Sequence, residues 1–150
     1  MTRHFAVVGS GSIGIGWAIV FARAGNRVKV YDLEKSRLDI FTQGVNERLH
    51  VLQEEGLLNE GADTIASRIS TSLDLAESLE GAEYIQECVP EQLEIKKNLF
   101  ATLEALAGDS AIIASSSFTS VPSAEATMTM ISAYLLTSSW AKSIARSRYT

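Results

Sequence analysis

Short apolar runs alternate with longer amphipathic segments along most of this 150-residue chain. Short apolar runs are typical of strands buried on both faces of a parallel sheet, whereas apolar residues that recur every three or four positions indicate helices. The runs predict five strands, of which the third has the weakest pattern: 4–8, 27–31, 68–71, 82–89 and 111–114. The helical periodicity covers four segments: 13–24, 34–55, 61–67 and 91–107.

The alternation of strands with helices predicts a doubly wound α/β fold around a parallel sheet, with right-handed crossovers. The segment 34–55 is longer than an ordinary crossover helix. Together with 61–67 it predicts a long helical insertion after the second strand. On the last helix, four apolar residues are expected to face the core: Ile95, Leu99, Leu103 and Leu106. Because no internal repeat is visible and the alternation ends near Ser117, we expect one domain over residues 1–123.

Composition adds little to this picture but excludes several classes of function. The chain is 46% hydrophobic and 21% charged, as in ordinary globular domains, and its net charge is −5. Acidic and basic residues are interspersed, so no surface for nucleic acid is expected. Cys88 is the one cysteine, which excludes an internal disulfide and a cysteine-based cluster, and we expect no metal. With no signal-peptide pattern and no apolar run long enough for a bilayer, we expect a cytoplasmic protein without membrane contact.

A glycine-rich segment, GSGSIG at 9–14, lies between the first strand and the first helix. In a dinucleotide-binding loop of this spacing, Gly9 permits a tight turn, Gly11 lets the backbone approach a pyrophosphate, and Gly14 lets the helix pack close to the strand. Ser12 and Ile13 begin the helix, whose N-terminus offers unpaired N–H groups and the positive end of its dipole to the phosphates. The glycine spacing alone is a weak signal, but its place between a strand and a helix favours a dinucleotide site.

Asp32 ends the second strand, at the distance from the glycines where such domains bind the adenosine ribose. A carboxylate there accepts hydrogen bonds from the ribose hydroxyls and repels a 2′-phosphate, so the predicted cofactor is NAD and not NADP. Lys35 and Arg37 are close in sequence and would weaken this preference if they faced the ribose. A triphosphate site is not expected, because no Lys-Ser or Lys-Thr follows the glycines. Two alternatives stay open: FAD as the cofactor, and a turn that only joins the strand to the helix.

The stretch 84–91 has the sequence YIQECVPE and is followed by Leu93, Glu94, Ile95, Lys96 and Lys97. Together with the glycine loop, the Tyr31-Asp32 pair, the long helical segment and the serine run at 115–117, this stretch resembles the 3-hydroxyacyl-CoA dehydrogenase family. The similarity is greatest to its lambda-crystallin branch, which includes L-gulonate 3-dehydrogenase, and it covers roughly residues 4–123. The resemblance implies a Rossmann-type NAD-binding domain.

The resemblance also implies roles for three side chains. Glu91 and Lys96 would line the nicotinamide side of the cofactor site, and Ser115, at the end of the fifth strand, would contact the reacting hydroxyl. Fatty-acyl members have asparagine at the next position, where this chain has Ser116, and this favours the lambda-crystallin branch. From the residues alone, Glu91 and Lys96 are also consistent with an ordinary pair on a helix surface, and Ser115 with a cap after a strand.

One part of the family pattern does not occur in this chain. Members pass a hydride from a secondary alcohol to NAD, with a histidine as general base in a His-Pro or His-Phe-Asn-Pro stretch after the serine run. The two histidines here, His4 and His50, fall on the predicted first strand and long helix. Residues 124–150 are rich in serine and threonine and contain no such stretch, so we expect a truncated or foreign tail. The family's C-terminal domain, which completes the substrate site and the dimer, is likewise expected to be absent.

These features predict the NAD-binding domain of an oxidoreductase that transfers a hydride to NAD. The hydride would come from the 3-hydroxyl of a 3-hydroxyacyl-CoA or a related hydroxy acid such as L-gulonate, which would be the small-molecule partner of the full-length parent. Because the general-base histidine is missing, we expect this chain alone to be inactive. The alternative is a non-catalytic NAD-binding module, either a sensor or a structural protein of the crystallin kind.

Overall fold

The computed structural model describes residues 2–116 as a sheet with helices on both sides. The strands are β1 (His4–Val8), β2 (Arg27–Tyr31), β3 (Ile69–Ser72), β4 (Tyr84–Glu87) and β5 (Ile112–Ser115). The helices are α1 (Ser12–Arg23), α2 (Lys35–Glu54), α3 (Ala62–Ala66), α4 (Leu75–Leu79) and α5 (Leu93–Leu106). The expected tail, 124–150, lies outside the described residues.

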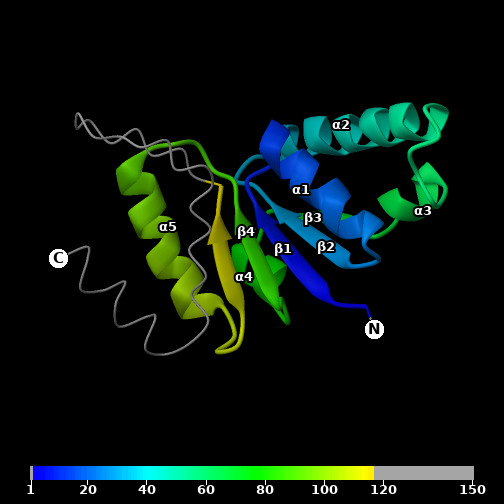
Figure 1. Cartoon of the computed structure of the whole chain (residues 1–150). Helices are drawn as coiled ribbons and strands as arrows, with labels where there is room; N and C mark the ends of the chain where they lie inside the picture. Colours follow the sequence, from blue (N-terminus) through cyan, green and yellow to red (C-terminus); the bar gives the residue numbers. More distant parts are fainter. Residues whose placement is uncertain (1, 117–150) are drawn as a thin grey trace, which may run out of the picture.

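The strands of the described region form one parallel sheet in the order β3-β2-β1-β4-β5 (Figure 1). β1 is central, and its residues Ala6, Val7 and Val8 are 0% exposed, as expected for an apolar strand covered on both faces. The chain builds outward from β1 through β2 and β3, and then returns to the other side of β1 with β4 and β5. The strand order therefore reverses between β1 and β4, which is where ligands bind in open α/β sheets. The predicted doubly wound fold is confirmed.

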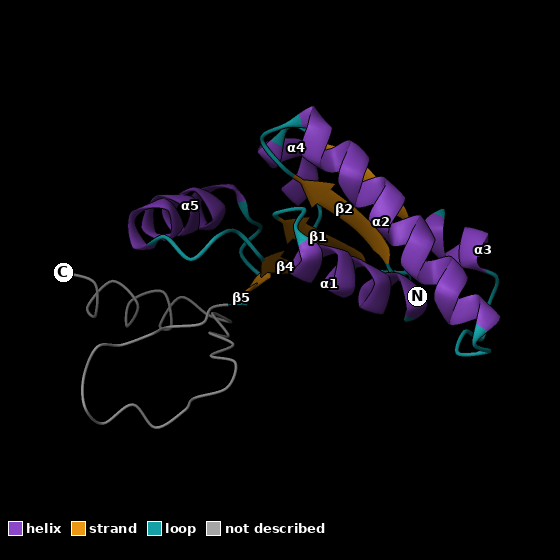
Figure 2. Ribbon diagram, turned by 90° about the horizontal axis from the view of Figure 1, so that it is seen from above, coloured by secondary structure: helices purple, strands orange, loops and turns teal. Residues whose placement is uncertain are grey.

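Helices cover both faces of the sheet (Figure 2), and each face has its own hydrophobic core. On one face, α1, α2 and α3 enclose a cluster that includes Val7 and Val30. On the other face, α4 and α5 pack over a cluster that includes Ala6, Val8 and Ile85. Successive residues of β1 belong to opposite clusters because side chains alternate across a strand. β1 therefore packs against both cores, and this packing fixes the position of its carboxyl end.

The connection from β2 to β3 contains α2 and α3, in the region where the periodicity predicted helices. α2 buries four residues spaced three or four apart: Leu38, Phe41, Val45 and Leu49. α4 lies in a segment for which the periodicity predicts no element, because five residues are too few to show a helical period. Its start nevertheless has a sequence signal, since the Asp74 carboxylate caps the helix by accepting from the Glu77 N–H at 3.0 Å.

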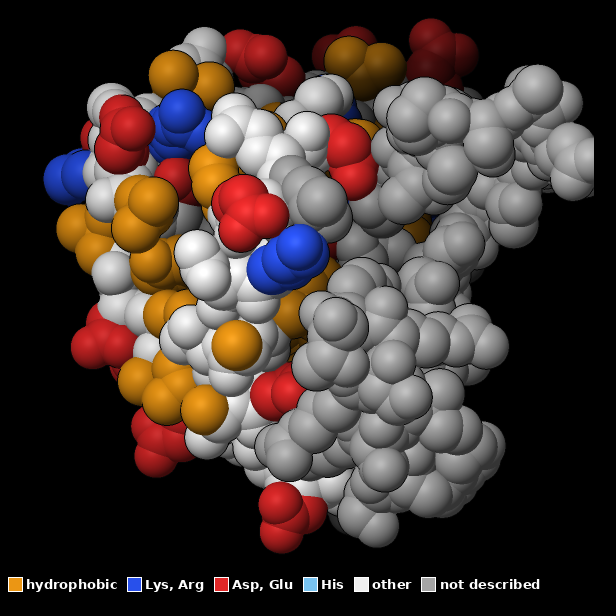
Figure 3. All heavy atoms as spheres, turned by 90° about the vertical axis from the view of Figure 1, so that its left-hand side faces the viewer, with side chains coloured by type: hydrophobic (Ala, Val, Ile, Leu, Met, Phe, Trp, Pro, Cys, Tyr) orange, Lys and Arg blue, Asp and Glu red, His pale blue; other side chains and the backbone are white. Residues whose placement is uncertain are grey.

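The predicted core face of α5 is partly wrong. Leu103 is 0% exposed, but Ile95 and Leu106 are 48% and 44% exposed. Figure 3 views the molecule from the α5 side, where apolar side chains lie at the surface among acidic and basic ones. Lys96 takes a buried position on the same helix, with 8% exposure. The periodicity of apolar residues misplaces this face because one of the side chains that form it is charged.

Truncation of Phe41 tests whether α2 belongs to the core. Phe41 is 1% exposed, so Phe41→Ala should lower the free energy of unfolding by about 3–5 kcal/mol. Its neighbour Ile40 is 69% exposed, and Ile40→Ala should change that free energy by less than about 0.5 kcal/mol. Urea denaturation followed by circular dichroism measures both variants. Equally small losses would show that α2 does not pack against the sheet as described.

Candidate functional site

The carboxyl ends of β2, β1, β4 and β5 lie in one row across the sheet. The register pairs Val8 with Tyr31 on one side and with Glu87 on the other, and it pairs Glu87 with Ser115. The glycine loop follows β1 directly, and the predicted acidic residue follows β2. Pairing of the strands therefore brings the sequence-predicted segments to the same edge of the sheet, at the point where the strand order reverses.

Two glycines of the loop are required by the fold itself. Gly9 has a φ of +105°, and a Cβ there would lie 2.8 Å from the carbonyl carbon of Cys88, just beyond β4. A Cβ at Gly14 would lie 2.2 Å from the carbonyl oxygen of Gly9. The Gly9 N–H also donates to the Tyr31 carbonyl at 2.9 Å. The loop is thus held between the ends of β2 and β4, with α1 packed directly against it.

Gly11 differs, because the protein itself gives no reason for its missing side chain. No described protein atom lies within 4 Å of the place where its Cβ would be, and its φ of −71° is open to any residue. In the described part of the chain, no side chain caps the start of α1, so the first N–H groups of this helix are available to an anion. Ile13, in the first turn, is 58% exposed. A bare backbone beside an uncapped helix end fits a pyrophosphate.

Asp32 lies beside the loop and is 9% exposed. Its Oδ2 accepts hydrogen bonds from the Ser10 N–H at 3.0 Å and from the Ser10 hydroxyl at 2.6 Å. No described residue donates to Oδ1, so that oxygen remains for the hydroxyls of a ribose. Lys35 and Arg37 form ion pairs of 2.8 and 3.5 Å with acidic side chains of their own segment, and neither pairs with Asp32. The carboxylate therefore keeps its charge uncompensated toward a ligand.

The helical connection contributes a basic side chain to the start of α1. The Arg48 guanidinium donates to the Ser12 carbonyl at 3.2 Å and to the Ser12 hydroxyl at 2.8 Å. A Cβ at Gly44, one turn earlier on α2, would lie 2.8 Å from Ile15 Cδ1, so α1 and α2 approach each other closely here. Arg48 adds a positive charge beside the helix end whose dipole already favours anions.

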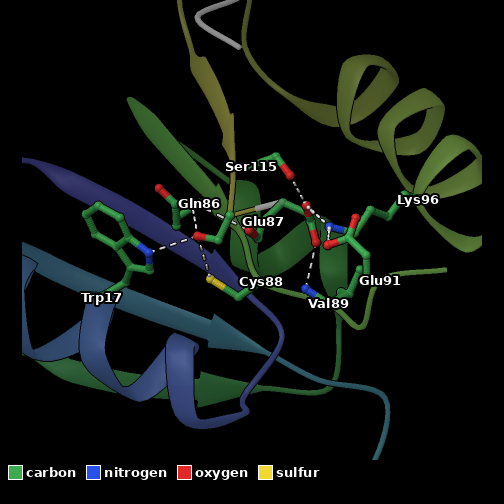
Figure 4. Close-up of polar contacts among 9 residues, drawn as sticks. Trp17, Gln86, Glu87, Cys88, Val89, Glu91, Lys96 and Ser115 are labelled. Carbon is green, nitrogen blue, oxygen red and sulfur yellow. Dashed lines mark hydrogen bonds and ion pairs between the residues drawn. The ribbon is translucent and has the colours of Figure 1, made fainter. Parts of the chain in front are cut away.

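A buried polar cluster lies at the ends of β4 and β5 (Figure 4). Glu87 is 0% exposed. Its carboxylate accepts from the Val89 N–H at 2.6 Å, from the Lys96 ammonium at 3.2 Å, and from the Ser115 hydroxyl. The same ammonium is 3.4 Å from Glu91 Oε2, on a side chain that is 44% exposed. One buried carboxylate thus binds both Lys96 and Ser115.

A second polar cluster involves the neighbouring side chains of β4 and β5 (Figure 4). Ser116 Oγ accepts from Trp17 Nε1 at 2.9 Å and from Gln86 Nε2 at 2.8 Å. Gln86 Oε1 in turn accepts from the Tyr84 hydroxyl at 3.0 Å. Burial raises the pKa of the Cys88 thiol to about 12, so almost no nucleophilic thiolate exists at neutral pH. The Ser116 hydroxyl thus joins Trp17 of α1 to Gln86 of β4, whereas the Ser115 hydroxyl binds the Glu87 carboxylate.

Neither histidine of the chain lies in these clusters. His4 begins β1, at the edge of the sheet opposite the glycine loop, and its Nδ1 is 2.8 Å from the Glu80 carbonyl oxygen. His50 is exposed on α2. Within residues 2–116, no group of acidic, histidine and cysteine side chains is arranged to hold a metal ion. No helix in that range is both long and apolar enough to cross a bilayer.

A glycine loop at the switch point of a parallel sheet, with a carboxylate after the second strand, defines a dinucleotide-binding domain of the Rossmann type. The sequence model of the family described as "3-hydroxyacyl-CoA dehydrogenase, NAD binding domain" matches residues 4–133. The chain belongs to this family, and its cofactor is NAD. The match extends past residue 123, where we expected the resemblance to end.

Individual relatives agree with this assignment. The lambda-crystallin homolog of Bos taurus is 45% identical over 120 residues, which are 79% of this chain and 37% of that protein. The L-carnitine dehydrogenase/betainyl-CoA thioesterase of Agrobacterium fabrum is 37% identical over 111 residues, which are 74% of this chain and 22% of that protein. The structure of 3-hydroxybutyryl-CoA dehydrogenase from Escherichia coli K12 matches with a TM-score of 0.72 and 30% identity, over 78% of this chain and 25% of that one. The chain thus spans little more than a third of the lambda-crystallin relative.

The structure also shows what the sequence analysis missed. Lys96 is not part of an ordinary surface pair, because Glu87 holds it in a buried position. Glu87 itself was assigned no role, although a charged residue at the end of a buried strand was a visible signal. Ser10 and Arg48 had no such signal, because their contacts depend on where β2 and α2 lie in the fold.

Two glycine substitutions separate a requirement of the fold from a requirement of the ligand. Gly14→Ala should lower the free energy of unfolding by about 3 kcal/mol or more, because the new methyl group collides with backbone. Gly11→Val enters open space and should cost no more than about 1 kcal/mol, as a poorer N-cap, yet weaken NAD binding more than about tenfold. Urea denaturation and calorimetric NAD titration provide the two readouts. Wild-type NAD affinity in folded Gly11→Val would show that the loop is only a turn.

Proposed function

We propose that the full-length protein is an NAD-dependent dehydrogenase that removes a hydride from the 3-hydroxyl of a 3-hydroxyacyl-CoA or a related hydroxy acid. This chain would supply the cofactor half of the site. One observation carries the proposal: the uncovered backbone at Gly11 lies at the switch point, with Asp32 on one side and the Lys96–Ser115 cluster on the other. A dinucleotide bound across the switch point would have its adenosine beside β2 and its nicotinamide over β4. When bound, NAD supplies the hydride acceptor.

Each site residue has a role in this proposal. Residues 11–13 bind the pyrophosphate, and Asp32 accepts hydrogen bonds from the adenosine ribose. Glu91 and Lys96 line the nicotinamide side, where the Lys96 ammonium lies at the carboxyl end of β4. Ser115 contacts the reacting hydroxyl. The strand register supports these roles, since it brings the ends of β1, β4 and β5 together.

A non-catalytic NAD-binding module is the second candidate, and one observation favours it for this chain by itself. A secondary alcohol must lose its proton as the hydride leaves, and a positioned general base supplies about 10²–10⁴-fold of the rate. His4 and His50 both lie away from the proposed site. We therefore propose that this chain alone is inactive. Further residues of the full-length protein would supply the base, the positioning of the substrate and the dimer contacts.

NAD should bind more tightly than NADP, and Asp32→Ala should remove most of this difference. Losing a charged hydrogen bond to the ribose should weaken NAD binding about ten- to a hundred-fold, whereas NADP loses a repulsion. Calorimetric titration of both cofactors against wild type and variant measures the change. Asp109→Ala is the matched control, because that carboxylate is exposed in the loop before β5, at the edge of the sheet opposite the glycine loop. Equal affinities of the wild type for NAD and NADP would contradict the proposed site.

The activity of the 150-residue chain tests the second half of the proposal. It should bind NAD yet form no measurable NADH with L-3-hydroxyacyl-CoA or L-gulonate, because neither His4 nor His50 lies at the proposed site to take the proton. The assay follows NADH absorbance at high protein concentration. Robust turnover would mean that another group takes the proton, and Glu91→Gln and Lys96→Met would be the variants that identify it.

A further inference from the structure

We propose that Glu87 is the positioning residue of the nicotinamide end of the site: its buried carboxylate holds the Lys96 ammonium where the second half of NAD binds. The proposal rests on the proposed function, since it takes Lys96 as a ligand of the nicotinamide half. It assigns a role to a side chain that is 0% exposed and touches no ligand itself.

The hydrogen bonds of Glu87 fix its orientation from three sides (Figure 4). The Val89 N–H and the Lys96 ammonium are donors only, so both require an ionised or accepting oxygen on Glu87. Oε1 accepts from Val89 at 2.6 Å, and Oε2 accepts from Lys96 at 3.2 Å and from the Ser115 hydroxyl. The backbone and Ser115 thus hold the carboxylate still, and the carboxylate in turn defines the position of the ammonium.

The location of Lys96 depends on this carboxylate. The Lys96 side chain is 9% exposed, and a buried ammonium is stable only beside a compensating negative charge. Glu91 also lies 3.4 Å away, but its side chain is 44% exposed, so water screens its charge more than that of the buried Glu87. Without the Glu87 charge, the long lysine side chain gains by extending its ammonium into water. Lys96 would then leave the switch point.

The burial of the Glu87–Lys96 ion pair is better explained by a ligand-binding site than by a gain in the free energy of folding. An apolar pair of similar volume would cover the end of β4 at lower energetic cost than two desolvated charges. The pair lies at the carboxyl edge of the sheet, at the switch point between β1 and β4, and not in the middle of either hydrophobic core. Charges buried at such a place are expected where a ligand needs a donor in a fixed position.

Glu87→Gln tests the proposal with the whole chain and two ligands. The amide oxygen replaces only one acceptor, and if it stays with Val89 the amide N–H groups face Lys96 and repel it. NADH affinity should fall about tenfold, the loss expected for one charged hydrogen bond. ADP-ribose lacks the nicotinamide half, so its affinity should change less than about twofold. NADH fluorescence and calorimetry with ADP-ribose give the two affinities.

Further variants show whether Glu87 acts through Lys96. Lys96→Met should cause a similar loss of NADH affinity, and the double variant should lose no more than either single one, because the two residues form one unit. The double variant removes both buried charges, so it is the fallback if Glu87→Gln alone fails to fold. In that case its NADH affinity should equal that of Lys96→Met. Glu94→Gln, on the same helix and 80% exposed, makes the same change of charge and should leave both affinities unchanged.

The outcomes distinguish the role of Glu87 from the proposed function on which it rests. If the wild-type chain binds neither NADH nor ADP-ribose, the proposed function fails. If it binds both, three results would overturn the role of Glu87. Glu87→Gln could bind NADH with wild-type affinity, or it could bind NADH and ADP-ribose equally weakly. Alternatively, the loss of NADH affinity in the double variant could equal the product of the losses in the two single variants.

Discussion

The close contact between the glycine loop and the end of β4 is the constraint on which the site depends. The backbone of Gly9 lies against the Cys88 carbonyl with no room for a Cβ, and Gly14 lets α1 begin directly against Gly9. This contact fixes the start of α1 at the carboxyl edge of the sheet, where the strand order reverses between β1 and β4. The uncapped helix end and the bare backbone of Gly11 are therefore already in place, so a phosphate bound there as proposed would cost little ordering of the chain.

Alternation of side chains across β4 and β5 divides the polar residues of the site into two groups. Glu87 and Ser115 meet on one face, where they bind Lys96 of α5. Gln86 and Ser116 meet on the other, where they bind Trp17 of α1. Ser115 and Ser116 are consecutive, yet their hydroxyls have different partners. The Ser115 hydroxyl binds the buried Glu87 carboxylate, whereas the Ser116 hydroxyl accepts from Trp17 and so joins α1 to the sheet.

Much of the fold and part of the site could be predicted from local patterns. The apolar runs identified each strand, although β4 is shorter than the predicted 82–89. The glycine spacing and Asp32 located the cofactor loop, because the conformation of a glycine and the end of a strand are local properties. The family resemblance indicates Lys96, but its burial could not be predicted, since the amphipathic pattern of a helix places a charged residue on the solvent side. Glu87 differs, because a charged residue at the end of a buried strand is visible in the sequence, but its partners Lys96 and Ser115 lie on other elements that only the fold brings together.

The sequence by itself determined the order of the elements, the turn after β1 and the acid after β2, because each follows from the chemistry of neighbouring residues. Only the tertiary structure decided that Glu87 pairs in register with Ser115, that Arg48 reaches Ser12, and that Ser10 holds one oxygen of Asp32. These contacts join strands and helices that are distant in the chain. Their geometry follows from the register of the whole sheet and from the close approach of α1 to α2, and no local pattern encodes either.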